Sequence, residues 1–457
     1  MTNDQFLGDD IKYIVHMSPH NVLNDPVYKK WIQSNSKATH FILDEKLGIR
    51  KHEKVVKLLE KLRKIDEEVY HLEPGVLEKN AGKFKKCEEN IKYLYTGTKV
   101  LLSQNLVETF HLNFYSGYVN SPKLPIQQAT NDDPYPKIHI LGTSSANIQV
   151  LRNSSCYLVY LSENSSILMD CGEGTLGQII CHFGEENYKN EIKKIKAIYI
   201  SHAHGDHQLG LMNILNERKK IDDKNLLYLC IPDNLNIILH PLQRLFKEKQ
   251  VFTNVKILLT EWFSKHFLDD LNESVKQVAE AKTNDLSPKQ MHKIQFDLKT
   301  SENINNFIKY LDLVQFETTL VNHMPFSCGL SIQLKNKFRL AYSGDCRPTK
   351  NFIEMIKNCD LLIHESTFRP DNIAMAKHLF HSTVDEAISV ANEANAKYLI
   401  LTHFGTMLSL QIDYIFYDST KFDNVGIAFD HMIVNRLNLH KIPTYNKAVR
   451  DAFKYLD

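Results

Sequence analysis

The 457-residue sequence lacks several features that mark specialised classes of protein. No run of apolar residues approaches the roughly 20 needed to cross a bilayer, so no membrane span is expected. None of the eight cysteines belongs to a Cys-x-x-Cys pair, which favours free thiols in a reducing compartment over a disulfide framework or a structural zinc knuckle. The charges nearly cancel, with 55 Lys and Arg against 54 Asp and Glu. Any contact with nucleic acid must therefore come from a local basic patch.

The N-terminal stretch MTNDQFLGDD also lacks the signals of exported or imported proteins. It is acidic, and it has neither the basic-then-apolar pattern of a signal peptide nor the Arg-rich pattern of a transit peptide. The sequence as it stands therefore indicates a protein of the nucleus or cytoplasm.

Short apolar runs that end in polar loops recur from Lys137 onward. They are KIHILGTSS, SILMDCGEG, KAIYISHAHGDH, FRLAYSGD, DLLIHEST, KYLILTHFG and GIAFDHMIV. Each is typical of a strand whose C-terminal loop carries unusual polar residues, and helical patterns lie between several of them. The clearest helix starts at Thr383, which is expected to form a capping box with Glu386. We therefore expect an α/β protein whose strand-end loops converge on one site.

Residues 51 to 70 show a different pattern, in which apolar residues recur at helical spacing among charged ones. This pattern predicts a charged amphipathic helix that lies on a neighbouring surface. Its apolar face would consist of Val55, Leu59, Leu62, Ile65 and Val69.

The stretch ISHAHGDHQLG concentrates three histidines and an aspartate within positions 202 to 207. Alternation at the end of a strand would put His202 and His204 on one side, and the turn that follows can direct Asp206 and His207 towards the same point. Imidazole and carboxylate are ligands suited to zinc. The alternative is an exposed histidine-rich loop without metal. It is disfavoured because the cluster directly follows AIYI, a strand of the buried type.

Three further residues at strand ends could complete the ligand set: His323 after TTLV, Asp345 at the end of AYSGD and His403 at the end of YLILTH. Taken singly, each would be explained more readily as a polar residue beside the core. Together with the cluster they make seven ligands, which are too many for one zinc ion but suit two. Asp345 is the natural bridge, since a bridging ligand needs two oxygens. Asp206 could then bind a metal and orient the activated water.

These residues resemble those of the metallo-β-lactamase superfamily, whose fold is a four-layer αβ/βα sandwich. Finer motifs over about residues 135 to 435 resemble the tRNase Z family, endonucleases that mature tRNA 3′ ends. LGTSSANIQVLRNSS is similar to the family's GTGSAxPxxxRN loop and MDCGEGTLGQI to its DCGEGTxxQ segment, although SSANI and HFGTML depart from the family pattern. The remaining motifs follow in the family's order: SHAHGDHQLG, YSGDCRP, LIHESTF, HSTVDEA and LTHF.

The resemblance implies a division of the ligands between two zinc ions. One ion would be held by His202, His204 and His323, the other by Asp206, His207 and His403, and both by Asp345. It also implies two catalytic residues besides Asp206, with His381 as general acid and Glu365 as its support. Elementary chemistry agrees, because the ribose 3′-oxygen of a cleaved phosphodiester is a poor leaving group that benefits from a proton. Without the resemblance, His381 would be an ordinary residue preceding a helix cap.

The implied activity is that of a zinc-dependent endoribonuclease, which cuts precursor tRNA after the discriminator nucleotide and leaves a 3′-hydroxyl. Glycines and small residues from position 142, with an arginine and an asparagine after them, suit a loop that approaches the RNA backbone. On residue types alone, a simple turn would explain them more readily. The residues expected to bind substrate are Gly142, Thr143, Ser144, Arg152, Asn153, Gly174 and Thr175.

The same resemblance predicts four segments. Residues 1–45 would be the remnant of a degenerate N-terminal metallo-β-lactamase-like half, 46–130 a helical linker, 131–440 the catalytic domain and 441–457 a C-terminal helical tail. The chain thus looks like a long form without most of its first half, either because Met1 comes from a truncated gene model or because the lineage has reduced the enzyme. We expect precursor tRNA as partner, with a second copy of the chain or a separate N-terminal half supplying the tRNA clamp. The resemblance also allows a mitochondrial pool.

Two other functions fit parts of the pattern. The same chemistry could serve a generic phosphodiester or sulfate ester. Superfamily relatives of that kind usually lack the combination of the family's HEAT motif, which reads HEST here and contains Glu365, with the HST motif that contains His381. An inactive RNA-binding scaffold is a third class, whose hallmark is the loss of metal ligands. Here all seven candidate ligands are present.

Overall fold

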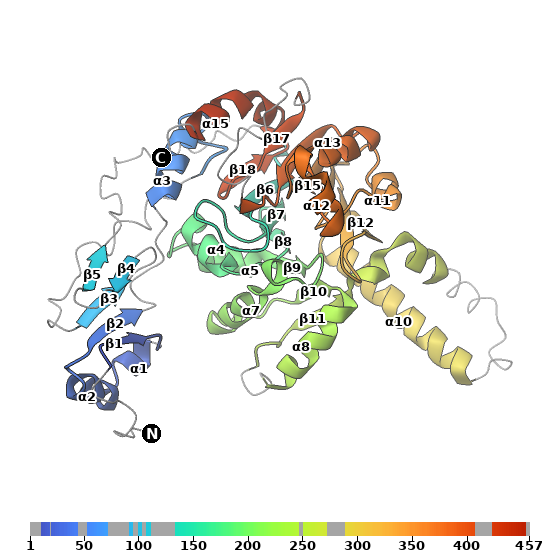
Figure 1. Ribbon diagram of the computed structural model, residues 1–457. Helices are drawn as coiled ribbons and strands as arrows, with labels where there is room; N and C mark the ends of the chain where they lie inside the picture. Colours follow the sequence, from blue (N-terminus) through green and yellow to red (C-terminus); the bar gives the residue numbers. More distant parts are fainter. Residues whose placement is uncertain are drawn as a thin grey trace.

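Figure 1 shows a computed structural model of the chain. It describes residues 11–18, 20–43, 53–71, 91–94, 99–102, 107–110, 133–245, 250–271, 288–406 and 423–453. Within these residues the backbone forms two large β-sheets, a three-stranded N-terminal sheet and a two-stranded hairpin.

The first large sheet has seven strands, in the spatial order β11 (Val255–Leu259), β10 (Leu227–Ile231), β9 (Ile195–Tyr199), β8 (Ser165–Met169), β7 (Cys156–Ser162), β6 (Lys137–Gly142) and β18 (Met432–Asn435). Successive side chains of a strand point to opposite faces. In β7, accordingly, Tyr157 and Val159 join one apolar cluster, whereas Leu158 and Tyr160 join another. The second cluster also contains residues of the helices that cover this face: α4 (Thr175–Phe183), α5 (Tyr188–Lys194), α7 (Leu211–Lys220) and α8 (Asp233–Leu245).

The second large sheet has six strands, in the order β12 (Leu313–Leu320), β13 (Cys328–Leu334), β14 (Arg339–Tyr342), β15 (Leu361–Glu365), β16 (Tyr398–Thr402) and β17 (Val425–Ile427). The two sheets pack face to face, and the rings of Tyr157 in β7 and Tyr342 in β14 lie 5.1 Å apart. Helices α11 (Lys350–Met355) and α13 (Val384–Glu393) pack against this second sheet. The expected four-layer αβ/βα sandwich is therefore confirmed (Figure 1).

The amphipathic helix expected over residues 51 to 70 is present as α3 (Glu53–Arg63), but it ends earlier than predicted. Leu62 in the helix and Val69 in the turn after it are both fully buried. Helix α3 packs on α15 (Asn446–Phe453), which follows η8 (Leu439–Tyr445). The predicted packing of an apolar face on a neighbouring surface is thus confirmed.

The N-terminal sheet consists of three parallel strands, β1 (Tyr13–His16), β2 (Thr39–Leu43) and β3 (Ile91–Leu94), with α1 (His20–Leu23) and α2 (Pro26–Ser34) between the first two. Strands β4 (Lys99–Leu102) and β5 (Val107–Phe110) pair as an antiparallel hairpin. The segment 46–130, predicted as a helical linker, therefore contains the strands β3, β4 and β5 as well as helix α3. The run IKYL of β3 finds pairing partners in β2, and this tertiary pairing decides its conformation.

The remaining elements lie in connections between strands. They are α6 (Gly205–Gln208), η3 (Thr260–Phe263), η5 (Pro370–Asn372), α12 (Ile373–His378) and the long α10 (Pro288–Tyr310), which projects from the body in Figure 1. None of the helices in the described ranges combines the length and the apolar character needed to cross a membrane.

Parallel strand order brings the expected site residues to one end of the sandwich. Strands β8 and β9 run parallel in the first sheet, as do β14, β15 and β16 in the second. The carboxyl ends of parallel neighbours lie at the same sheet edge. His202 follows β9, Asp345 follows β14 and His403 follows β16, so loops from both sheets meet there.

The capping box at the start of α13 is confirmed: Thr383 Oγ1 accepts from the Glu386 amide at 3.3 Å, and the Glu386 side chain accepts from the Thr383 amide at 3.0 Å. We expect Thr383→Ala to lower the free energy of unfolding by about 1 kcal/mol, because the amide loses its acceptor. Urea denaturation of the zinc-free protein measures this change. The exposed hydroxyl of Ser389 in the same helix provides the control, and Ser389→Ala should change stability by less than about 0.5 kcal/mol. Equal effects of the two substitutions would contradict a capping role.

Candidate metal centre

The histidine-rich loop runs from the end of β9 into the short helix α6. His204 is extended, with φ −63° and ψ 150°, and the helix begins immediately after it. This change of direction turns Asp206 and His207 back towards the strand end. Gly172 and Gly210 hold the neighbouring loop against this turn, because a Cβ at Gly172 would lie 2.2 Å from the Asp206 carbonyl and one at Gly210 would lie 2.2 Å from the Gly172 carbonyl.

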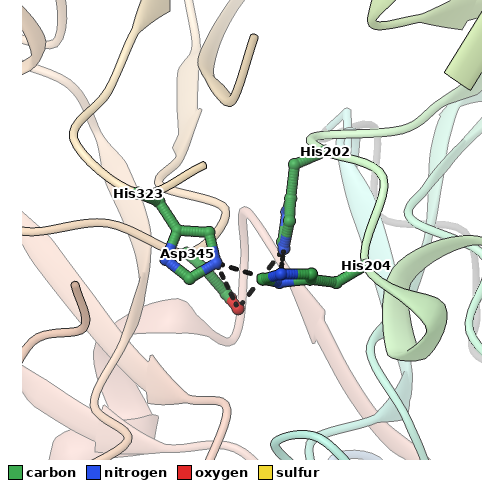
Figure 2. A group of neighbouring side chains, drawn as sticks. All are labelled: His202, His204, His323 and Asp345. Carbon is green, nitrogen blue, oxygen red and sulfur yellow. Dashed lines mark hydrogen bonds and ion pairs between the residues drawn. The ribbon is translucent and has the colours of Figure 1, made fainter. Parts of the chain in front are cut away.

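Four of the expected ligands form a first group, drawn in Figure 2: His202, His204, His323 and Asp345. His204 Nδ1 lies 3.0 Å from both His202 Nε2 and His323 Nε2. Asp345 Oδ2 lies 3.6 Å from His202 Nε2 and 3.8 Å from His323 Nε2. Ligands about 2.0–2.1 Å from a tetrahedral zinc ion are about 3.3 Å apart, so these spacings suit one ion.

A second group shares Asp345 with the first and adds Asp206, His207 and His403. His207 Nε2 lies 3.4 Å from Asp206 Oδ2 and 3.3 Å from Asp345 Oδ2. His403 Nε2 lies 3.3 Å from Asp206 Oδ2 and 3.3 Å from Asp345 Oδ1. All seven residues expected as ligands are therefore brought together, with Asp345 in both groups.

Hydrogen bonds at the outer edge of the site fix the tautomers of four histidines. Ser201 Oγ and Thr367 Oγ1 each donate to a carboxylate, so each can accept from an imidazole. The Nδ1–H acceptors are Ser201 Oγ for His202 (3.0 Å), Asp170 Oδ2 for His207 (2.7 Å), the Phe380 carbonyl for His323 (2.9 Å) and Thr367 Oγ1 for His403 (2.9 Å). Each neutral ring then has a lone pair on Nε2, and these four atoms point inwards. Converging lone pairs repel one another unless a cation lies between them.

Asp345 gives a second, independent indication of a cation. It is 2% exposed, and its Oδ1 has no hydrogen-bond partner among the described residues. Burial by itself would raise the pKa of Asp345, and positive charge at the positions of His207, His403 and His202 lowers it well below its usual range. Because the three rings are neutral in the tautomers described above, that charge has to come from a bound cation. A buried, ionised carboxylate with an unsatisfied oxygen is costly in a protein without a compensating cation. The donor set therefore fits metal ions with imidazole and carboxylate ligands, as zinc prefers.

Asp170 supports the centre from the end of β8. Its carboxylate accepts four hydrogen bonds, from the Ser201 amide (2.7 Å), Ser201 Oγ (2.9 Å), His207 Nδ1 (2.7 Å) and Tyr342 Oη (2.6 Å). Ser201 belongs to the loop after the first-sheet strand β9, whereas Tyr342 belongs to the second sheet. Asp170 thus fixes the ring of His207 and also ties the two sheets together beneath the site.

His381 and Glu365 lie beside the second group. Glu365 Oε1 accepts from His381 Nδ1 at 2.9 Å and from the Cys346 amide at 2.8 Å, and Oε2 accepts from Thr367 Oγ1 at 2.6 Å. Burial lowers the pKa of His381, but the charge and hydrogen bond of Glu365 outweigh it and raise that pKa to about 9. His381 is therefore mostly protonated at neutral pH. Because Glu365, His381 and His403 also lie close enough together to ligate a metal, His381 could serve either as an acid or as a ligand.

An open cleft of about 390 Å³ gives access to these side chains. Asp206, Asp345, His381 and His403 line it together with Glu173 and the small-residue loop Ser145, Ala146 and Asn147. Ser154 and Leu209 also line it and were not predicted from the sequence. The signal for the turn at 145–147 was the small-residue stretch SSAN. Ala146 has a positive φ of 61°, and its amide donates to Asp206 Oδ2 at 2.7 Å.

The residues expected to bind substrate lie behind this turn. The cleft lining includes none of Gly142, Thr143, Ser144, Arg152, Asn153, Gly174 and Thr175. Arg152 is only 2% exposed, and its guanidinium lies over the rings of Phe404 and Phe429. The geometry contradicts the expected phosphate contact of Arg152, because its charge serves the protein interior. Asn153 likewise donates to the Glu173 carbonyl at 3.0 Å.

Most of the chain is similar in sequence to known proteins. Residues 165–404 match a family model described as "Beta-lactamase superfamily domain". The chain is 26% identical over 452 residues to zinc phosphodiesterase ELAC protein 2 of Macaca fascicularis, covering 95% of this chain and 52% of that protein. It is 32% identical over 311 residues to the mitochondrial ribonuclease Z of Drosophila melanogaster, covering 66% of this chain and 35% of that protein. The chain thus spans about half the length of the curated relatives it matches.

A solved structure with the same architecture is a long form RNase Z from yeast. The match has a TM-score of 0.65 and 22% sequence identity, and it covers 91% of this chain and 64% of that chain. This likeness supports the four-layer fold.

The contacts of Asp170 lead to a prediction about metal affinity. Asp170→Asn should weaken zinc binding about 10- to 100-fold, because His207 loses the carboxylate that orients it. Competition with a chromophoric chelator measures the affinity. Asp223→Asn removes another buried carboxylate, which pairs with Arg218 away from the site, and should leave zinc affinity unchanged. Equal zinc affinity in wild type and Asp170→Asn would contradict the assignment of His207 as a ligand.

Proposed function

The chain belongs to the beta-lactamase superfamily, and we propose that it is a zinc-dependent endoribonuclease that removes 3′ trailers from precursor tRNA. One observation carries the proposal: a seven-ligand centre and the His381–Glu365 pair face the same cleft. The cut would fall after the discriminator nucleotide and leave a 3′-hydroxyl on the tRNA. The names of the relatives, zinc phosphodiesterase and ribonuclease Z, support RNA as the substrate.

Two zinc ions are proposed, each with its own ligands. His202, His204 and His323 would hold one ion, Asp206, His207 and His403 the other, and Asp345 both. When bound, such a pair activates a water molecule and stabilises negative charge on the phosphodiester. Asp206 lines the cleft, and its Oδ2 already accepts from the Ala146 amide, so its carboxylate is held in place to orient the attacking water.

His381 is proposed as the general acid. Its Nδ1 donates to Glu365, so Nε2 is the ring nitrogen that would give a proton to the departing ribose 3′-oxygen. Glu365 stabilises the charged ring, and its carboxylate is held in turn by the Cys346 amide and by the amide and hydroxyl of Thr367. Proton transfer in the same step as bond cleavage avoids the release of a free alkoxide.

A clamp for the body of the tRNA is part of the proposal, supplied by an N-terminal half or by a second copy of the chain. The motivation is electrostatic, since a net charge of +1 provides little general attraction for a polyanion. Contacts with phosphate alone would make binding weak and sensitive to salt. Tighter tRNA binding after addition of a separate N-terminal half, or tRNA binding that rises with dimer formation, would support this part.

The proposed location is the nucleus or cytoplasm, with a mitochondrial pool. Two relatives carry the word mitochondrial in their names, which supports such a pool. Imaging of the tagged protein with organelle markers tests this part.

The decisive assay uses zinc-loaded protein and a precursor tRNA with a 3′ trailer. We expect a single cut after the discriminator, a 3′-hydroxyl on the tRNA and a 5′-phosphate on the trailer. No cleavage, with or without an added N-terminal half, would remove the proposal. Fast hydrolysis of bis(4-nitrophenyl) phosphate without cleavage of precursor tRNA would favour a general phosphodiesterase instead.

Asp206→Ala should abolish cleavage and leave the fold intact, because one ligand of the second ion and the orienting carboxylate are both lost. Cleavage rate, together with the thermal midpoint of the zinc-free protein, measures this. Asp371→Ala removes an exposed carboxylate whose partner is Arg369, and it should cleave like wild type. Retained cleavage in Asp206→Ala would contradict the proposed role.

His381→Ala should slow cleavage by about 10² to 10⁴-fold while both zinc ions stay bound, since the proton donor is lost but the ligands remain. Single-turnover kinetics and the zinc content of the purified protein measure the two effects. His378→Ala, at an exposed position in α12, serves as the control. Loss of zinc in His381→Ala would instead identify His381 as a ligand.

A further inference from the structure

The guanidinium of Arg152 is buried and makes its contacts inside the protein, although only Nη1 has hydrogen-bond partners among the described residues and Nε and Nη2 have none. Its Nη1 donates to Thr143 Oγ1 at 2.8 Å and to the Ala428 carbonyl at 2.7 Å. Its Cζ lies 4.4 Å from the ring centroid of Phe404 and 4.7 Å from that of Phe429. Aromatic faces and a planar cation attract each other when water is excluded. The side chain is therefore held on several sides.

Asp430 supplies the opposite charge next to this arginine. Its Oδ1 accepts from Thr143 Oγ1 at 2.7 Å, and its Oδ2 accepts from the Asn153 amide at 2.7 Å and from Gln178 Nε2 at 3.0 Å. Thr143 Oγ1 thus accepts from Arg152 and donates to Asp430. Burial lowers the pKa of Arg152 to about 10, which still leaves it charged at neutral pH, and the nearby carboxylate favours that charge. The hydroxyl of Thr143 thus links the two buried charges, which compensate each other inside the protein.

The same residues connect to the metal centre through the backbone. The Phe404 amide donates to the Thr143 carbonyl at 2.9 Å, and the Ser145 amide donates to the Phe404 carbonyl at 3.2 Å. Phe404 directly follows the expected ligand His403. The residue after Ser145 is Ala146, whose amide donates to Asp206 Oδ2 at 2.7 Å. A continuous series of contacts therefore leads from the buried charges to the carboxylate at the cleft.

We propose that Arg152, Thr143 and Asp430 form a positioning unit that fixes the 145–147 turn and thereby orients Asp206 at the metal centre. The amide of Ala146 directs one oxygen of the Asp206 carboxylate, and it can do so only while the turn stays in register with Phe404. Loss of the guanidinium removes a positive charge near the buried Asp430 and the donor to Thr143 Oγ1, so the loop shifts to admit water in its place. Asp206 then loses a fixed donor and becomes free to rotate.

A phosphate ligand and a positioning residue affect kinetics differently. A residue that binds the RNA backbone would contribute to substrate binding, so its loss would raise KM for tRNA. Hydrolysis of a small ester that does not contact this residue would be unchanged. A residue that orients Asp206 would change kcat for every substrate and would also change metal affinity. Thr143 separates the two roles most sharply, because its side chain is fully buried and cannot touch RNA.

The test compares Thr143→Val, Arg152→Met and Arg152→Lys with wild type. We expect Thr143→Val and Arg152→Met to weaken binding of one zinc ion about tenfold and to lower kcat about tenfold or more on both precursor tRNA and bis(4-nitrophenyl) phosphate. KM for tRNA should stay within about twofold. Arg152→Lys keeps the charge but loses the planar fork, so it should fall between wild type and Arg152→Met.

Matched controls remove similar groups elsewhere. Arg339→Met deletes a guanidinium that donates to the Lys357 carbonyl and to Ser331 Oγ, at the end of β14 remote from Asp345. Thr318→Val deletes a buried hydroxyl that donates to the Thr260 carbonyl. Both should retain wild-type zinc affinity and kcat. Thermal midpoints of the zinc-free proteins show whether each variant folds. If Arg152→Met does not fold, Thr143→Val decides the outcome.

The proposal rests on the proposed function only for the tRNA assay, because zinc affinity and hydrolysis of the small ester report on Asp206 by themselves. If wild type does not cleave tRNA, the proposed function fails while the zinc titration still decides this inference. A raised KM for tRNA in Arg152→Met, with unchanged zinc affinity and unchanged hydrolysis of the small ester, would overturn it and restore Arg152 as a phosphate ligand. Wild-type zinc affinity in both Thr143→Val and Arg152→Met would also overturn it.

Discussion

The buried carboxylate of Asp345 is the constraint on which the rest of the site depends. It lies between two groups of imidazole nitrogens, and one of its oxygens has no hydrogen-bond partner among the described residues. Such a group is tolerable only beside positive charge, and the surrounding rings point lone pairs rather than protons towards it. The arrangement is therefore suited to binding cations. A change in the outer hydrogen bonds would alter the orientation of the histidine rings and with it the affinity for metal ions.

Two other carboxylates hold this arrangement from outside. Asp170 fixes His207 and Ser201, and it also receives the hydroxyl of Tyr342 from the opposite sheet. Glu365 orients His381 and, through Thr367, reaches His403. Each buried acid is satisfied by several donors, so the geometry is fixed before any substrate arrives. A preorganised site of this kind avoids the cost of reorienting dipoles during the reaction.

A third buried acid, Asp430, serves the loop that borders the cleft. With Arg152 and Thr143 it forms a charged network beneath the turn that carries Ala146. The residues that line the cleft are thus distinct from the buried residues that hold them in place. In a sandwich whose functional loops cluster at one end, a rigid support is needed because loops have little packing of their own.

The sequence by itself predicted the seven residues that the structure brings together, because three histidines and an aspartate within positions 202 to 207 follow a strand of the buried type and three further candidates lie at other strand ends. It also determined the α/β class, the helix near residues 51 to 70 and the cap at Thr383, all of which depend on local pattern. Tertiary structure decided the rest. A run such as IKYL becomes a strand only where β2 offers pairing partners. The family resemblance predicted Arg152 as a phosphate contact, yet the rings of Phe404 and Phe429 and the charge of Asp430 come from positions more than 250 residues away. The local sequence around Arg152 does not predict these partners, because the burial and pairing of a charge are properties of the folded chain.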